Sequence, residues 1–324
     1  MRTIPALSFL AVGGVAVLIG LAFARDEKAA EVRVSGRSDV MPTSFGQLEY
    51  ASAGRGPPVL MIHGTGGGFD QGLTFAEGLL SRGHRVIAPS RFGYLRTDFP
   101  ADPSSEHQAD ALVELLDSLH IGKLPVAGGS AGALSAVQFA LRHHDRTSAL
   151  ILIVPAANVR GTDPVQMSAM QEFLVRRLAT SNFLFWTGIR VARDPMIGTL
   201  LATDPALVRQ AAPSEQRRAA RILDEIMPVA RRSEGMLNDA KLAGNPARVD
   251  FGRIAVPTLV ISVADDRFGT ARTARDIAAA VPNSRLVIYP RGGHIWVGHD
   301  SELWEEVARF LASVEAAASA RRGS

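Results

Sequence analysis

A serine with glycines on both sides is the residue pattern that points most directly to chemistry. Ser130 stands at the centre of Gly128–Gly132, with an apolar run, Leu124–Ala127, before it and an amphipathic run, Ala131–Arg142, after it. This order predicts a strand, a tight turn and a helix, which together lift a nucleophile clear of a sheet at a helix N-terminus that favours negative charge. We interpret Ser130 as a nucleophile; the alternative is a helix cap whose glycines serve packing.

A serine hydroxyl needs a base to take its proton and an acid to orient that base. Candidates for both the acid and the base follow apolar runs near the C-terminal end of the chain. Asp265 and Asp266 come after Thr258–Val263, and His294 comes after Arg285–Tyr289 and a pair of glycines. Because the carboxyl ends of parallel strands share one rim of the sheet, we expect these groups to lie near the serine. The residues alone leave either aspartate open as the acid.

Among the other histidines, only His299 competes with His294 as the base, because it also follows the last strand-like run. The rest lie beside predicted strands or on and after predicted helices, where structural roles account for them. They are His63, His84, His107, His120, His143 and His144.

A glycine-rich loop, His63–Gly68, follows the apolar run Pro58–Ile62. Its unshielded backbone N–H groups, together with the N–H of Ala131, are suited to stabilising an oxyanion. A phosphate loop is excluded because no Lys-Ser/Thr pair follows the glycines. We expect His63 to brace the loop through hydrogen bonds. Histidines and carboxylates do not occur at metal-ligand spacing, so the predicted chemistry uses no metal and no cofactor.

The apolar runs of the chain predict the strands that position these residues. They are Val32–Ser35, Leu48–Ser52, Pro58–Ile62, Arg85–Ala88, Leu124–Ala127, Leu150–Val154, Thr258–Val263 and Arg285–Tyr289. Amphipathic stretches such as Ser105–Leu119 and Leu303–Val314 separate several of them. The alternation predicts an α/β fold with a doubly wound, mostly parallel eight-stranded sheet. Residues 158–253 show helical pattern only, which predicts an inserted helical cap between core segments 25–157 and 254–324.

The N-terminal segment is apolar without interruption from Ile4 to Phe23. About 20 residues of helix span a bilayer, which favours a membrane anchor over residues 1–24. The alternative is a signal peptide, since Ala22–Ala24 is a small-x-small cleavage site. Either interpretation places the remaining chain at the cell envelope, anchored with an extracytoplasmic catalytic domain or exported after cleavage near Ala24.

Composition narrows the classes of function further. The chain has 324 residues and no cysteine, which excludes disulfides, cysteine-ligated metals and a thiol nucleophile. The net charge is +3, yet residues 160–250 hold 13 basic and 10 acidic side chains, and the remainder balances. Basic residues form no long run with interleaved aromatics, so we expect a small-molecule substrate and no nucleic-acid partner.

Taken together, these motifs resemble those of the α/β-hydrolase superfamily from about Leu48 to Ala312. Capped members carry an HG-x-G loop, a D-R-x-G-Y-G-x-S segment, a GxSxG turn, a cap after strand six, an acid and a G-H histidine. The matching segments here are His63–Gly68, Ser90–Tyr94, Gly128–Gly132, the insertion from Asn158, Asp266 and His294. The register favours Asp266 over Asp265. Departures are Ser90, Val263 and Leu95, where the pattern has Asp, Gly and Gly.

The resemblance implies a serine hydrolase that works through an acyl-enzyme, with Ser130, His294 and Asp266 as catalytic triad. It also implies an oxyanion hole made by the N–H groups of Thr65 and Ala131. A carboxylic ester with a small or medium apolar acyl group is the expected substrate. A C–C bond hydrolase, an aminopeptidase and a perhydrolase use the same triad, and a non-catalytic binding or receptor protein on this fold is the alternative of another class.

Apolar residues of the cap are the candidates for an acyl pocket: Met167, Met170, Phe173, Leu174, Phe183, Phe185 and Trp186. The alternative is that most of them attach the cap to the sheet. Trp296, which follows His294 closely, is a candidate for the pocket mouth.

Overall fold

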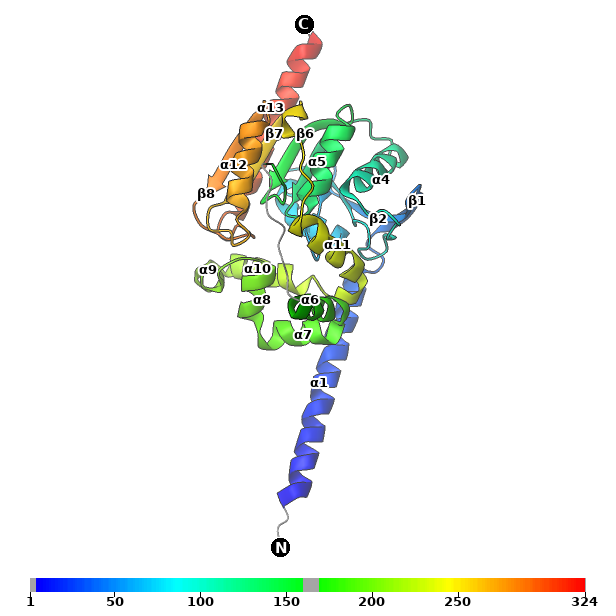
Figure 1. Cartoon of the computed structure of the whole chain (residues 1–324), viewed down its shortest axis with the longest axis vertical. Helices are drawn as coiled ribbons and strands as arrows, with labels where there is room; N and C mark the ends of the chain where they lie inside the picture. The colour runs from blue at the N-terminus through cyan, green and yellow to red at the C-terminus, as the bar shows by residue number, and fades with distance from the viewer. Residues whose placement is uncertain (1–3, 160–168, 324) are drawn as a thin grey trace.

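The computed structural model describes residues 4–159 and 169–323, and its centre is a sheet of eight strands (Figure 1). The strand order is β1-β2-β4-β3-β5-β6-β7-β8. β2 is antiparallel to both of its neighbours, and the remaining pairs are parallel. The bounds are β1 Asp39–Thr43, β2 Gly46–Ala53, β3 Pro58–Ile62, β4 Arg85–Pro89, β5 Leu124–Gly129, β6 Thr147–Ile153, β7 Thr258–Val263 and β8 Ser284–Tyr289. The predicted doubly wound, mostly parallel sheet is confirmed.

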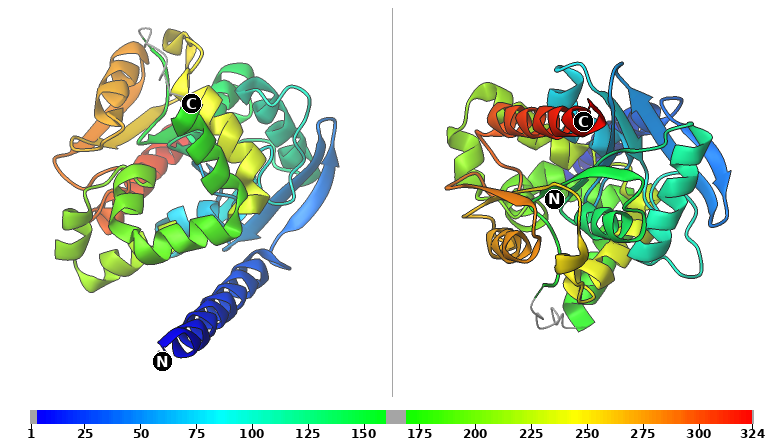
Figure 2. Two further views of the ribbon diagram at one scale, coloured as in Figure 1. Left: turned by 60° about the horizontal axis from the view of Figure 1, so that its bottom comes forward. Right: turned by 90° about the horizontal axis from the view of Figure 1, so that it is seen from above.

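Helices cover both faces of the sheet (Figures 1 and 2). One face carries α4 (Ser105–Ser118), α5 (Gly132–Arg142) and α12 (Thr270–Ala280); the other carries α2 (Phe69–Phe75), α3 (Glu77–Leu80) and α13 (Asp300–Gly323). Successive strand residues enter opposite cores: Leu60 of β3 packs with α4 and α5, whereas Met61 packs on the other side. This alternation explains why the parallel strands are apolar throughout, since both faces are buried.

The connection from β6 to β7 holds the helices that stand over the carboxyl ends of the strands (Figure 1). They are α6 Ala169–Thr180, α7 Asn182–Val191, α8 Arg193–Leu200, α9 Pro205–Gln210, α10 Pro213–Asp224 and α11 Ser233–Gly244, and we call them the cap. Short 3₁₀ turns at Val229–Arg232 and Phe251–Arg253 complete the connection. The division into core and cap segments at residues 157 and 254 stays a prediction.

Helix α1 (Ile4–Val34) runs past Ala24 and ends against the body of the molecule. The side chains of residues 4–12 lie outside the described part, so the predicted apolar segment is described only from residue 13 on. Within that part, side chains from Val15 to Leu21 are exposed, whereas Ala30 and Val34 are buried. Over the described residues, none of the helices is both long enough and apolar enough to cross a membrane.

The predicted strand Val32–Ser35 is wrong, because Val32–Val34 belong to the last turn of α1 and the first strand begins at Asp39. Four residues of alternating polarity fit a strand or a helix end equally well. The helix prevails here because Ala30 and Val34, four positions apart, both enter the core on one helical face.

Candidate active site

Ser130 occupies a strained turn between β5 and α5. Its φ of 51° is in the left-handed region, and its N–H donates to the Ile153 carbonyl at 2.9 Å. A Cβ at Gly128 would lie 2.7 Å from the Gly132 carbonyl oxygen, and one at Gly132 would lie 2.5 Å from the Ile62 carbonyl oxygen. Side chains at these two positions would therefore collide with backbone, so the flanking glycines are required for the turn.

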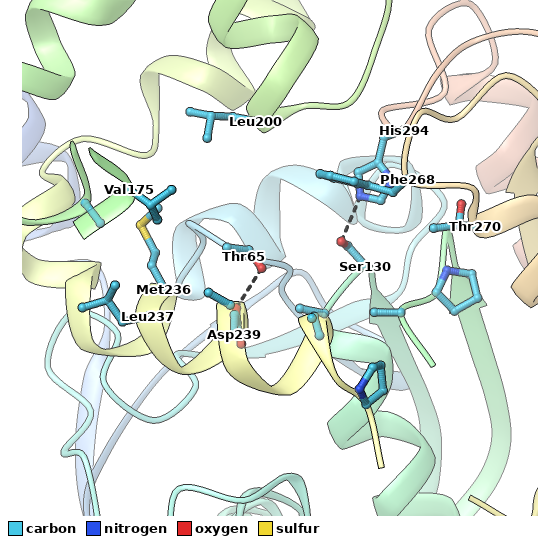
Figure 3. A pocket seen from close by; sticks show the side chains of 18 of the residues that line it. Thr65, Ser130, Val175, Leu200, Met236, Leu237, Asp239, Phe268, Thr270 and His294 are labelled. Atoms are coloured by element: carbon cyan, nitrogen blue, oxygen red, sulfur yellow. Dashed lines mark hydrogen bonds between the residues drawn. The ribbon is translucent and has the colours of Figure 1, made fainter. Parts of the chain in front are cut away.

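The imidazole of His294 lies between Ser130 and Asp266. Its Nε2 is 2.9 Å from the Ser130 Oγ (Figure 3). Its Nδ1 is 2.8 Å from the Asp266 Oδ2. Asp266 also accepts from the Phe268 N–H at 2.9 Å and from the Thr270 hydroxyl. The structure thus brings together the three side chains predicted from far-apart segments, in the order nucleophile, base and acid.

Asp266 remains ionised because its partners outweigh its burial. Burial alone raises its pKa, but the bonds from His294, Thr270 and Phe268 N–H lower the pKa below its ordinary value. The neighbouring Asp265 is exposed and accepts from the Gly293 N–H at 2.8 Å instead. Of the two aspartates, Asp266 is therefore the one that contacts the histidine ring, and Asp265 braces the loop that carries it.

The glycine-rich loop lies directly against the nucleophile. A Cβ at Gly64 would be 3.2 Å from the Ser130 Cβ. Within the loop, Gly64 N–H donates to Gln71 Oε1 at 3.0 Å and Gly66 N–H to the Tyr94 hydroxyl at 3.3 Å. Across the described residues, the backbone N–H of Thr65 has no such acceptor, and the same is true of Ala131. These two groups are the candidate oxyanion donors.

His63 braces this loop, as predicted. Its Nδ1 is 2.7 Å from the Gly64 carbonyl oxygen, and its Nε2 accepts from the Arg91 N–H at 2.9 Å. Burial and the nearby Arg91 guanidinium hold the pKa of His63 well below its ordinary value. The ring is therefore neutral, with Nδ1 as the donor, and its hydrogen bonds do not change across physiological pH.

A cavity of about 510 Å³ opens above Ser130 between the cap and the sheet. This volume is typical of small-molecule sites. Its walls are mainly apolar: Val175, Leu178, Phe185, Met196 and Leu200 from α6, α7 and α8, and Met236, Leu237, Ala240 and Ala243 from α11. No lysine or arginine is among the described residues that line it. Phe268 stands edge-on to the His294 ring, with the centroids 4.9 Å apart.

Of the cap residues predicted to line a pocket, Phe185 does so. Met167 falls outside the described residues, as does the side chain of Leu174. Met170, Phe173 and Phe183 are exposed, and Trp186 packs on α1, where its Nε1 donates to Asp26 at 2.9 Å. The α11 wall is not among the predicted pocket residues, although Met236, Ala240 and Ala243 recur at helical spacing on one face.

Two further side chains lie away from the cavity. Trp296 is 1% exposed, contacts Phe75 edge-on, and donates its indole N–H to Asp300 at 2.9 Å. Its predicted place at the mouth of the pocket is therefore wrong. Its φ of 45° lies in the left-handed region, and its indole packs in the hydrophobic core. His299 lies on Tyr289, with centroids 4.3 Å apart, and its Nδ1 is 2.9 Å from Glu302.

An eight-stranded, mostly parallel sheet with a serine, histidine and aspartate at its carboxyl rim defines the class of α/β hydrolases. A family model described as alpha/beta hydrolase fold matches residues 57–297, and the chain belongs to this family. It is a hydrolase.

A curated relative is the 2-hydroxy-6-oxononadienedioate/2-hydroxy-6-oxononatrienedioate hydrolase of Paraburkholderia xenovorans, which is 32% identical over 82% of this chain and 88% of its own. Among solved structures, an alpha/beta hydrolase fold protein from Nakamurella multipartita is 25% identical, with a TM-score of 0.64 over 85% of this chain and 98% of its own. A thermophilic esterase from Thermogutta terrifontis is 23% identical, with a TM-score of 0.61 over 86% and 99%.

Proposed function

We propose that the protein is a serine esterase that cleaves neutral carboxylic esters with an apolar acyl group. The observation that carries the proposal is the 2.9 Å contact between Ser130 Oγ and His294 Nε2 at the floor of the apolar cavity. A hydroxyl held on a histidine that is itself held by a carboxylate is an activated nucleophile.

In the proposed reaction, Ser130 Oγ attacks the ester carbonyl carbon while His294 Nε2 takes the hydroxyl proton. Asp266 accepts from Nδ1 and stabilises the imidazolium that forms. The oxyanion accepts hydrogen bonds from the N–H groups of Thr65 and Ala131. As the carbonyl reforms, the C–O bond breaks and His294 donates its proton to the departing alcohol oxygen. Water then attacks the acyl-enzyme by the same route and releases the carboxylic acid.

The charge of the cavity wall favours a neutral substrate. Among the described residues of the wall, the acidic one is Asp239, and the guanidinium of Arg91 already pairs with it. A substrate carboxylate placed against the remaining wall would lose its hydration without gaining a cationic partner among the described residues, which is costly. An uncharged acyl chain has no such penalty and gains from contact with the apolar lining.

The second candidate is a C–C bond hydrolase, favoured by the names of the curated relatives. Those names specify dioates, which carry two carboxylates. A direct comparison tests the choice: p-nitrophenyl butyrate and octanoate against 2-hydroxy-6-oxononadienedioate on the same preparation. We expect kcat/KM for the esters to exceed that for the dioate by at least roughly 100-fold. The opposite order establishes the C–C hydrolase and overturns the esterase.

We also propose that the uncleaved α1 holds the protein at a membrane of the cell envelope. Exposed apolar side chains along the helix, including Val17, Leu18 and Leu21, would be favourably transferred to lipid. Phe23 packs edge-on against Phe183 and Trp186 of α7, with centroids 5.3 and 5.6 Å away, so cleavage after Ala24 would separate these rings.

Cell fractionation with N-terminal sequencing tests this placement. We expect the protein in the membrane fraction with residues before Ala24 retained. A soluble product that begins at Arg25 would instead establish export after cleavage.

A further inference from the structure

Asp239 is a buried carboxylate of the cap that faces the glycine-rich loop of the core. It lies on α11 and is 1% exposed. Both of its oxygens accept from Arg91, with Nη1–Oδ1 and Nη2–Oδ2 distances of 2.6 Å. Oδ2 accepts in addition from the Tyr94 hydroxyl at 2.6 Å and from the Thr65 hydroxyl at 2.9 Å (Figure 3). None of these donors comes from the cap, so the carboxylate joins the two parts of the molecule.

The partners of Asp239 are the groups that hold the loop in place. Thr65 is bound directly. Tyr94 accepts from the Gly66 N–H at 3.3 Å, and Arg91 Nε donates to the His63 carbonyl at 3.0 Å. Three anchoring points along the loop, at His63, Thr65 and Gly66, therefore converge on one carboxylate. The N–H of Thr65, which has no acceptor among the described residues, lies among them.

We propose that Asp239 is a positioning residue that aims the Thr65 N–H at the oxyanion of the reaction. The inference rests on the proposed esterase function and adds a residue that does not touch the reacting atoms. Preorganised donors stabilise a developing oxyanion because they need no reorientation during the reaction, so the direction of the N–H matters more than its presence. The Thr65 side chain is bound at Oγ1, and this bond restricts rotation of the peptide that carries the N–H.

The ionised state of Asp239 is required for this role. A carboxylate is an acceptor only, and the groups of Arg91, Tyr94 and Thr65 that bond to Asp239 all donate to it. Burial and the adjacent carboxylate raise the pKa of Tyr94 well above its ordinary value, so its hydroxyl stays protonated and donates. An asparagine would present an NH₂ group to at least one of these donors and would loosen the loop.

Two variants test the inference by different routes. Asp239→Asn removes the charge, while Thr65→Val removes only the hydroxyl and leaves the Arg91–Asp239–Tyr94 contacts intact, so it also serves if Asp239→Asn fails to fold. We expect each to lower kcat by roughly 10- to 100-fold, with KM changed by less than about 3-fold. Thr65→Ser, which restores the hydroxyl, should recover most of the loss. Asp194→Asn, at an exposed ion pair elsewhere in the cap, is the matched control with wild-type rates.

Measurements that depend on stabilisation of the oxyanion distinguish positioning of the Thr65 N–H from a general loss of structure. The rate constant for labelling of Ser130 by a fluorophosphonate, and the affinity for a trifluoromethyl ketone, should fall by the same factor as kcat/KM in both variants. The pH dependence of kcat/KM should keep its midpoint, because the His294 contacts are unchanged.

Unchanged labelling and ketone affinity in Thr65→Val overturn the inference while leaving the esterase in place, and so does a loss confined to KM. A wild-type protein that the fluorophosphonate does not label overturns both the proposed function and the inference.

Discussion

Arg232 and Asp70 form a bidentate ion pair inside the protein, with Nη1–Oδ1 and Nη2–Oδ2 distances of 3.0 and 2.7 Å. The arginine is fully buried and precedes α11 of the cap, whereas the aspartate lies on α2, just after the glycine-rich loop. Arg33 at the end of α1 reaches the same carboxylate, with its Nε 3.8 Å from Oδ2. Core, cap and α1 therefore meet at one buried charge.

Removing one member of this pair should destabilise the fold strongly. Arg232→Met leaves Asp70 buried without its bidentate partner, and we expect the free energy of unfolding to fall by about 3–5 kcal/mol. Guanidinium denaturation at pH 7 measures the change. Arg209→Met, at an exposed pair with Asp194, is the control and should cost no more than about 1 kcal/mol. Equal effects of the two substitutions would contradict the structural role of the buried pair.

Acid should unfold the protein partly through Asp70. Burial alone raises the pKa of this carboxyl, but Arg232 and Arg33 outweigh it and lower the pKa below its ordinary value. A depressed folded-state pKa stabilises the protein above the unfolded value of about 3.9, and this stabilisation is lost as the pH falls through the folded pKa. Denaturation at pH 7, 5, 4 and 3 should therefore show declining stability below about pH 4. In Asp70→Asn the free energy of unfolding should be lower at pH 7 and should decline less steeply as the pH falls. Parallel declines in the variant and the wild type would show that Asp70 does not cause the acid sensitivity.

Loss of the nucleophile should nearly abolish turnover. Ser130→Ala should lower kcat on the order of 10³-fold or more, with KM little changed, because the cavity is intact. Steady-state assays on p-nitrophenyl esters measure the loss, and fluorophosphonate labelling should disappear in parallel. Turnover near the wild-type rate would exclude the acyl-enzyme mechanism.

The adjacent aspartates should differ sharply in their effect on rate. Asp266→Asn alters the group that holds the His294 tautomer, and we expect kcat to fall on the order of 10³-fold. Asp265→Asn weakens only the bond to the Gly293 N–H, so its loss should stay below about 10-fold. Both variants are compared in the same ester assay, with circular dichroism to verify folding. A larger loss of kcat in Asp265→Asn than in Asp266→Asn would identify Asp265 as the acid of the triad.

Acyl-chain preference should depend on the small residues of α11. Ala243 lines the cavity, and Ala243→Phe should fill part of its volume of about 510 Å³. We expect kcat/KM for p-nitrophenyl octanoate to fall by at least roughly 10-fold relative to the acetate ester. Ala247→Phe, at an exposed position outside this cavity, is the control. An unchanged preference across the chain-length series would place the acyl group elsewhere.

Local sequence patterns predicted most strands of the sheet and the turn at Ser130. A buried parallel strand is apolar throughout and is bounded by turn residues. Strands such as β3 and β7 can therefore be recognised from a few consecutive residues. The Gly128 position is recognisable for the same reason, because the clash that it avoids is with the Gly132 carbonyl of its own turn, whereas Gly132 avoids a clash with the Ile62 carbonyl of β3. The strand prediction at Val32–Ser35 is wrong because its short alternation of polarity fits a strand and a helix end equally well.

The sequence by itself determined the α/β fold, the elbow at Ser130 and the segments that supply an acid and a histidine, because each depends on contiguous residues. Only the tertiary structure decided that Asp266 rather than Asp265 contacts His294, and that Trp296 turns into the core. It alone revealed that Asp239, 174 positions from Thr65, binds the loop of the candidate oxyanion hole. The physical reason is that these contacts join residues that are far apart in the chain, between loops of the core or between the cap and the core, and such partners leave no periodic trace in the sequence.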